Sequence, residues 1–111
     1  MFERNTPQMD DLSCLRCPGC DQPYVHHTAA DIFETGEERK GTVHVRAEAG
    51  TFTVDQNVSK NPSPYRHGVT LSFYCEICPT LFDLEIYQHK GSTVLNVKKT
   101  GEDPTHGRQE V

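Results

Sequence analysis

Two cysteine pairs constrain this chain more than any other sequence feature. Cys17 and Cys20 enclose a Pro-Gly dipeptide, and Cys75 and Cys78 enclose Glu-Ile. Two C-x-x-C units supply the four thiolates of a tetrahedral metal site. A two-residue gap lets both sulfurs of one tight turn face the same ion, while backbone N–H groups of the turn donate hydrogen bonds to the sulfurs. The sequence therefore predicts that these four cysteines are metal ligands.

The predicted cofactor is one Zn²⁺ per chain. A single iron also accepts four thiolates, so the spacing alone leaves zinc and iron open. A site closed by four protein ligands has no open position at which to activate water. The ion is therefore expected to be structural, and no catalytic residue is assigned to it.

The register of the first cysteine pair has an alternative. Cys14 and Cys17 are also two residues apart. Pro18 favours the pair Cys17 and Cys20, because its ring presets the backbone for a tight turn. Cys14 is then either a small residue packed near the site, or a replacement ligand or redox-sensitive thiol.

The low content of hydrophobic residues suggests that a metal contributes to the stability of the fold. The chain has 111 residues, which suits one domain, but only 34% are hydrophobic and none is Trp. A structural zinc site contributes roughly 10–16 kcal/mol, which matches or exceeds the net stability of a typical domain. A metal that closes the chain between residues 20 and 75 can therefore compensate for a thin core. Removal of the metal is expected to unfold the protein.

Alternation of apolar and polar residues predicts an all-β fold, a β-meander of about five to six strands. An inserted hairpin is expected from residues 42–46 and 51–55, with Phe52 and Val54 facing inward. Three further strands are expected at residues 69–75, 81–89 and 93–99, the last two joined by a tight turn. A strand is also favoured over one helical turn within residues 24–35.

The remaining segments are expected to be irregular. Residues 1–12 read as a flexible N-terminal tail, residues 13–99 as the β domain, and residues 100–111 as a disordered C-terminal tail. Residues 56–67 hold two Pro, two Asn and two Ser, which is typical of a surface loop.

A cytoplasmic location is expected. The chain contains no apolar run long enough to span a membrane, and its N-terminus lacks the apolar stretch of a secretory signal. In a reducing compartment, paired cysteines bind metal more often than they form structural disulfides.

The cysteine pattern resembles the zinc ribbon, a module with two C-x-x-C knuckles on β-hairpins and often Pro after the first Cys, as in CPGC here. The runs CPGCDQPYVHH, NPSPYRHG, FYCEIC and IYQHKGSTVL resemble small uncharacterised zinc-ribbon proteins of actinobacteria and their mobile elements. The resemblance implies metal binding and a cytoplasmic location, and it implies no reaction. Asp21 and Pro79 stand where many knuckles have Gly, and the 54 residues between Cys20 and Cys75 exceed what a minimal ribbon needs.

A protein partner is favoured over nucleic acid. The formal charge is −5, and four thiolates with one Zn²⁺ bring it to −7, which opposes a general grip on phosphates. An acidic β module with edge strands can instead add a strand to a partner or present a loop to it. The alternative is a nucleic-acid-binding regulator that uses a local patch, with Tyr65 stacking on a base and positive charge from Lys60, Arg66, His67, Lys90, Lys98 and Lys99.

An enzymatic role is not expected. The sequence has no Gly-rich phosphate loop, no H-E-x-x-H and no nucleophile elbow. A second metal site built from His26 or His27 with His67 or His89 is disfavoured, because neighbouring side chains on a strand point to opposite faces. The sequence does not determine the oligomeric state.

Overall fold

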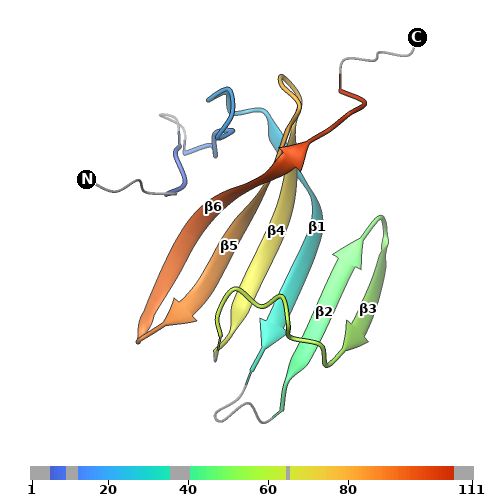
Figure 1. Ribbon diagram of the computed structural model, residues 1–111, viewed down its shortest axis with the longest axis vertical. Helices are drawn as coiled ribbons and strands as arrows, with labels where there is room; N and C mark the ends of the chain where they lie inside the picture. The colour runs from blue at the N-terminus through green and yellow to red at the C-terminus, as the bar shows by residue number, and fades with distance from the viewer. Residues whose placement is uncertain (1–5, 10–12, 36–40, 65, 107–111) are drawn as a thin grey trace.

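The computed structural model describes residues 6–9, 13–35, 41–64 and 66–106, and within them it confirms the all-β prediction (Figure 1). Six antiparallel strands form one sheet, and these residues include no helix. None of them, accordingly, forms a helix able to cross a membrane. The strands are β1 (Val25–Glu34), β2 (Val43–Glu48), β3 (Thr51–Asp55), β4 (Gly68–Cys75), β5 (Thr80–His89) and β6 (Ser92–Glu102).

The strand order is β3-β2-β1-β4-β5-β6, so two three-stranded meanders lie side by side (Figure 1). Strands that follow one another in the chain are neighbours except at the step from β3 to β4, where residues 56–67 carry the chain back across the sheet. This step pairs β4 with β1. The predicted hairpin of residues 42–46 and 51–55 is β2–β3, and it extends the sheet beyond β1.

A tight turn connects the two strands of each hairpin, β2–β3 and β5–β6, at the positions that the sequence indicated. Ala49 and Gly50 have φ of 51° and 81°, and Lys90 and Gly91 have φ of 51° and 83°. Two successive residues with positive φ make the turn that matches the right-handed twist of an antiparallel pair. Gly occupies the second position in both turns, where a side chain would be strained.

The pairing register gives the sheet two different faces. Phe33 pairs with His44 and His44 with Asp55, so these side chains share one face. Ile32 pairs with Val45 and with Val69, on the other face. The polar face is defined by Asp31, Phe33, His44, Arg46, Asp55, Thr70, Ser72, Asp83, Glu85 and Lys98. The apolar face is defined by Ala30, Ile32, Val43, Val45, Ala47, Phe52, Val54, Val69, Leu71, Phe73, Phe82, Leu84, Ile86, Leu95 and Val97.

The sheet forms a single layer, and this overturns one expectation. Each strand contacts only its hydrogen-bonded neighbours, so no second sheet packs on the apolar face. Phe52 and Val54, which were expected to face inward, are 72% and 60% exposed. The alternation assigned them correctly to one face with Val45. The expectation failed because alternation reports which residues share a face, and not whether anything covers that face.

The buried residues form two groups. One comprises Ala29 and Phe33 on the polar face, together with Ser63 in the connection between β3 and β4. Ser63 is held there by donating to the backbone oxygen of Gln88 at 2.8 Å. The other group lies at the cysteine end of the sheet, and its members are Cys17, Cys75, Phe82 and Val97.

Strand ends differ in detail from the sequence prediction. The last strand continues beyond Lys99 to Glu102, because Gly101 and Glu102 pair with the start of β5. A bulge between His27 and Ala29 interrupts the β1–β4 register, in the segment where one helical turn was the minor alternative. Residues 1–5, 10–12 and 107–111 of the expected tails lie outside the described residues.

Candidate metal centre

The two cysteine knuckles meet because β1 pairs with β4. The first knuckle, residues 17–20, precedes β1, and the second, residues 75–78, follows from the end of β4. Val25 pairs with Cys75, and the backbone N–H of Glu76 donates to the backbone oxygen of Tyr24 at 2.9 Å. The strand pairing thus fixes the distance between two segments that are far apart in the sequence.

The four sulfurs are arranged as a metal site requires. One ligand atom from each of Cys17, Cys20, Cys75 and Cys78 lies within 4.8 Å of all the others. The Sγ atoms of Cys17 and Cys78 are 3.7 Å apart, and those of Cys20 and Cys75 are 3.6 Å apart. Sulfurs that bind one tetrahedral Zn²⁺ at about 2.3 Å are separated by about 3.8 Å. The sulfur set therefore fits one ion of this kind.

Cys14 is not part of this group. Its side chain is exposed, while Cys17 and Cys75 are buried and Cys20 and Cys78 are half-buried. The structure thus assembles the register Cys17 and Cys20, which Pro18 favoured, with the second pair.

Hydrogen bonds to the sulfurs follow the pattern expected of metal-binding turns. The backbone N–H of Gly19 donates to Cys17 Sγ at 3.2 Å, and that of Ile77 donates to Cys75 Sγ at 3.3 Å. Pro79 lacks an N–H, and Cys78 Sγ instead makes a hydrogen bond with Thr80 Oγ1 at 3.2 Å. Hydrogen bonds of this type orient ligands and offset thiolate charge.

The thiols differ in how firmly they hold their protons. Burial raises the pKa of Cys17, and it raises the pKa of Cys20 to about 12. Burial acts in the same direction on Cys78, but hydrogen bonds with Thr80, Cys17 and Cys20 together outweigh it and lower the pKa of Cys78 to about 6. A metal must displace the remaining protons, so its binding is coupled to their release.

Close packing holds the two knuckles together. A Cβ on Gly19 would lie 2.1 Å from Thr80 Oγ1, so only glycine fits at this position without a shift.

Residues 103–106, which were assigned to the C-terminal tail, contact the second knuckle. The N–H of Asp103 donates to the oxygen of Pro79 at 2.7 Å, and His106 Nε2 lies 3.2 Å from the oxygen of Ile77.

The histidines considered for a second metal site are dispersed. His26 contacts Glu76 and packs on Tyr74, whereas His67 Nδ1 accepts from the N–H of Thr35 at 3.1 Å. His27 packs against Phe73 on the opposite side of β1 from His26, and His89 ends β5. Within the described residues, the cysteine cluster is the one group of three or more His, Cys, Asp or Glu side chains arranged to hold a metal.

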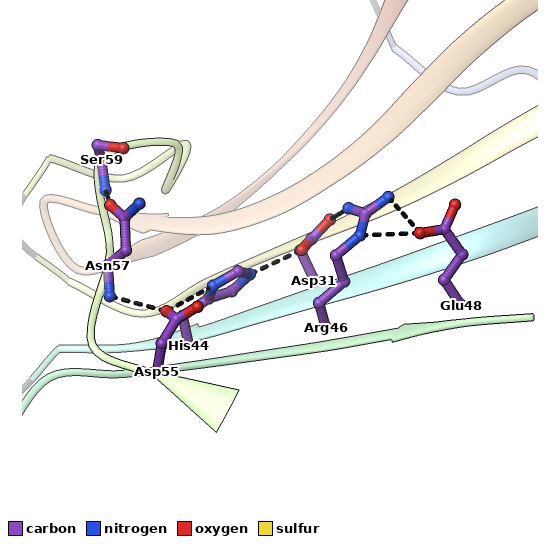
Figure 2. A network of polar contacts seen from close by, with 7 residues as sticks. All are labelled: Asp31, His44, Arg46, Glu48, Asp55, Asn57 and Ser59. Carbon is purple, nitrogen blue, oxygen red and sulfur yellow. Dashed lines mark hydrogen bonds and ion pairs between the residues drawn. The ribbon is translucent and has the colours of Figure 1, made fainter. Parts of the chain in front are cut away.

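The polar face carries a second cluster, which the sequence did not single out (Figure 2). Asp31 is 8% exposed, and its two carboxylate oxygens lie 2.7 Å from His44 Nε2 and 2.6 Å from Arg46 Nη1. The other nitrogen of His44 lies 2.9 Å from Asp55, and Arg46 also donates to Glu48. The sequence showed His44 and Arg46 only as the polar positions of an alternating strand.

Two of the basic residues considered for nucleic-acid binding, Lys60 and Lys98, lie among acidic ones. Lys60 and Lys98 line one open cavity of about 640 Å³ on the polar face, and Asp31, Asp83 and Glu85 line it too. The mixed charge gives this cavity no positive footprint of the kind that binds phosphates. Tyr65 lies outside the described residues.

Comparison of the chain with protein-family models, curated proteins and solved structures gives no match.

Proposed function

We propose that this protein is a zinc-stabilised protein-interaction module of the cytoplasm, with a structural and non-catalytic metal. The observation that carries the proposal is the cluster of four sulfurs within 4.8 Å of one another. Four protein ligands complete a tetrahedral shell and leave no site for a substrate or a reactive water. The metal then joins the segment before β1 to the β4–β5 connection and stabilises the sheet.

Zinc is proposed over iron because the inferred role is structural. Zn²⁺ has no redox chemistry and takes a tetrahedral shell without a geometric demand of its own. The zinc-ribbon resemblance of residues 17–20 and 75–78 points in the same direction. Iron in the same shell would instead suggest electron transfer.

A protein partner is proposed over nucleic acid on two grounds. The chain is acidic, and Lys60 and Lys98 share their cavity with carboxylates. The apolar face is accessible, as shown by the 51% exposure of Leu95 and the 42% exposure of Ile32. Exposed apolar patches of this kind mark protein-binding surfaces.

The metal can be tested by mass spectrometry under native and denaturing conditions. One zinc per chain is expected, retained in Cys14→Ser and lost in Cys78→Ser. Cys14→Ser is the matched control because it is the same substitution at an exposed cysteine outside the cluster. Iron, two metals per chain, or zinc lost equally from both variants would contradict the proposal.

The partner class can be tested by capture from the protein's own host, with and without nuclease, using zinc-loaded protein. Captured proteins are expected to survive nuclease treatment and to be lost from a variant of the apolar face, Ile32→Asp. Loss of every captured component on nuclease treatment would favour the nucleic-acid-binding regulator instead.

A further inference from the structure

The apolar face is too extensive to remain in water. In an antiparallel sheet with one side in solvent, apolar and polar residues alternate along each strand, and the apolar side packs on a core. Here that side has aliphatic and aromatic residues on all six strands, and no strand packs over it. The segment around the first knuckle covers one corner: Gln8, Arg16 and Pro18 line one cavity with Val97 and Lys99, and Val97 and Phe82 are buried there.

The size of the face matches a protein–protein interface. Six strands of about eight residues, spaced by about 4.8 Å with about 3.3 Å per residue, span on the order of 700 Å², of which the corner at Phe82 and Val97 is already covered. A stable interface buries about 800 Å² per partner, whereas the largest apolar patch of a typical monomer is about 300–600 Å².

The absence of charge inside the apolar face allows a second copy to be the partner. The chain carries −5, so two copies repel each other over most of their surface. The apolar face has no charged side chain in its interior. Glu34 and Lys99, which also point to this side, lie toward strand ends at its margin. Two such faces can therefore meet without burying an unpaired charge, which is the main penalty of a like-charged contact.

We infer that two copies of this chain associate through their apolar faces to form a two-layered β-sandwich. A two-fold axis between the sheets brings the same patch of each copy together, as in most homodimers. The two sheets then lie about 10 Å apart, with Ile32 and Leu71 in the shared core. The inference rests on the proposed protein-interaction role and names the partner.

A competing dimer would pair the exposed edge of β3 with its counterpart, extending the sheet. The two arrangements differ in what they require of neighbouring side chains. Val54 and Thr53 are adjacent on β3, and they point to the apolar and the polar face. A charge at Val54 is buried by the face-to-face dimer, while a charge at Thr53 stays in solvent. In edge pairing the two positions are equivalent in exposure.

The test is sedimentation or light scattering of the zinc-loaded full chain over about a hundredfold range of concentration. We expect twice the chain mass of 12.5 kDa. Val54→Asp and Ile32→Asp are expected to weaken association by at least about a hundredfold, because each buries two uncompensated carboxylates per dimer. Thr53→Asp is expected to associate like the wild type. Retained zinc and an unchanged circular dichroism spectrum establish that each variant folds.

Three results would overturn the inference. A wild-type chain that stays monomeric throughout excludes self-association, and retained nuclease-resistant partners would leave the proposed function standing. Unchanged dimerisation of both Val54→Asp and Ile32→Asp would place the contact elsewhere. Equal weakening by Thr53→Asp and Val54→Asp would indicate edge pairing. If Ile32→Asp fails to fold, Val54→Asp still decides, because Val54 is 60% exposed on an edge strand.

Discussion

The imidazole of His44 is held by the buried carboxylate of Asp31, 2.7 Å from Nε2. The contact joins β2 to β1, and the second ring nitrogen extends it to Asp55 on β3 (Figure 2). Two carboxylates on one imidazole favour its charged form. The pKa of His44 is raised, although burial alone would lower it, because the hydrogen bonds and charges of Asp31 and Asp55 outweigh that effect.

This contact predicts how stability depends on pH. A group with a raised pKa in the folded state stabilises the fold fully below its unfolded pKa, about 6.5 for His. That contribution is lost as the pH rises through the folded-state pKa. His44→Gln is therefore expected to lower the free energy of unfolding more at pH 6 than at pH 9. The measurement is urea unfolding of both proteins at the two pH values.

His89→Gln is the control, since His89 is exposed at the end of β5. It is expected to leave the pH dependence of unfolding unchanged. An equal loss of stability from His44→Gln at both pH values would show that the imidazole acts through packing on Phe33, with which it stacks at 4.6 Å between ring centroids.

Metal removal is expected to unfold the chain. Without the ion, nothing would bridge the two knuckles at the buried cysteines Cys17 and Cys75. A structural zinc contributes roughly 10–16 kcal/mol, which a single-layered sheet with a small core does not replace. In the presence of a strong chelator, the circular dichroism spectrum of the protein should lose its β-sheet signal. Addition of stoichiometric Zn²⁺ should restore that signal. A native spectrum in the metal-free protein would contradict this expectation.

The cysteine cluster and the strands were predictable because both depend on the spacing of residues that are close in the sequence. The C-x-x-C interval brings two sulfurs to one turn, and alternation assigns Val45 and Val54 to a common face. The partner of each strand was not predictable in the same way. The pairing of β1 with β4 depends on a crossing by residues 56–67, and no local pattern specifies which strand that crossing reaches.

The polar cluster escaped prediction for a related reason. Asp31 lies in β1 and His44 in β2, and their contact requires the register Asp31–Arg46 and Phe33–His44. In the sequence, a polar position on an alternating strand looks like a solvent-facing one. The polar face is partly covered here by residues 57–60, so these side chains are shielded from solvent.

Gly19→Ala is expected to weaken metal binding. The added methyl would lie 2.1 Å from Thr80 Oγ1 and 3.4 Å from Cys78 Sγ, so either Thr80 rotates away from Cys78 or the knuckles separate. Competition with a chromogenic chelator should show a lower zinc affinity. The same substitution in a Thr80→Ala background should cost less, because the clashing hydroxyl is gone. Equal losses in the two backgrounds would show that the clash with Thr80 is not the cause.

Two phenylalanines, one on each hairpin, are expected to differ most in how much their replacement lowers the free energy of unfolding. Phe82 is 0% exposed and stacks on Phe73 with ring centroids 5.1 Å apart, whereas Phe52 is 72% exposed. Phe82→Ala is expected to lower the free energy of unfolding by about 3–5 kcal/mol, because it leaves a cavity beside the metal site. Phe52→Ala is expected to change it by less than about 0.5 kcal/mol in the monomer.

The comparison is made by urea unfolding of zinc-loaded protein at low and at high concentration. At low concentration the two variants should differ as stated. At high concentration Phe52→Ala should lose stability relative to the wild type, because the wild type alone then gains fully from association through the apolar face. A Phe52→Ala effect that is large at low concentration would mean that the β2–β3 part of the apolar face is covered within a single chain, which contradicts the 72% exposure of Phe52.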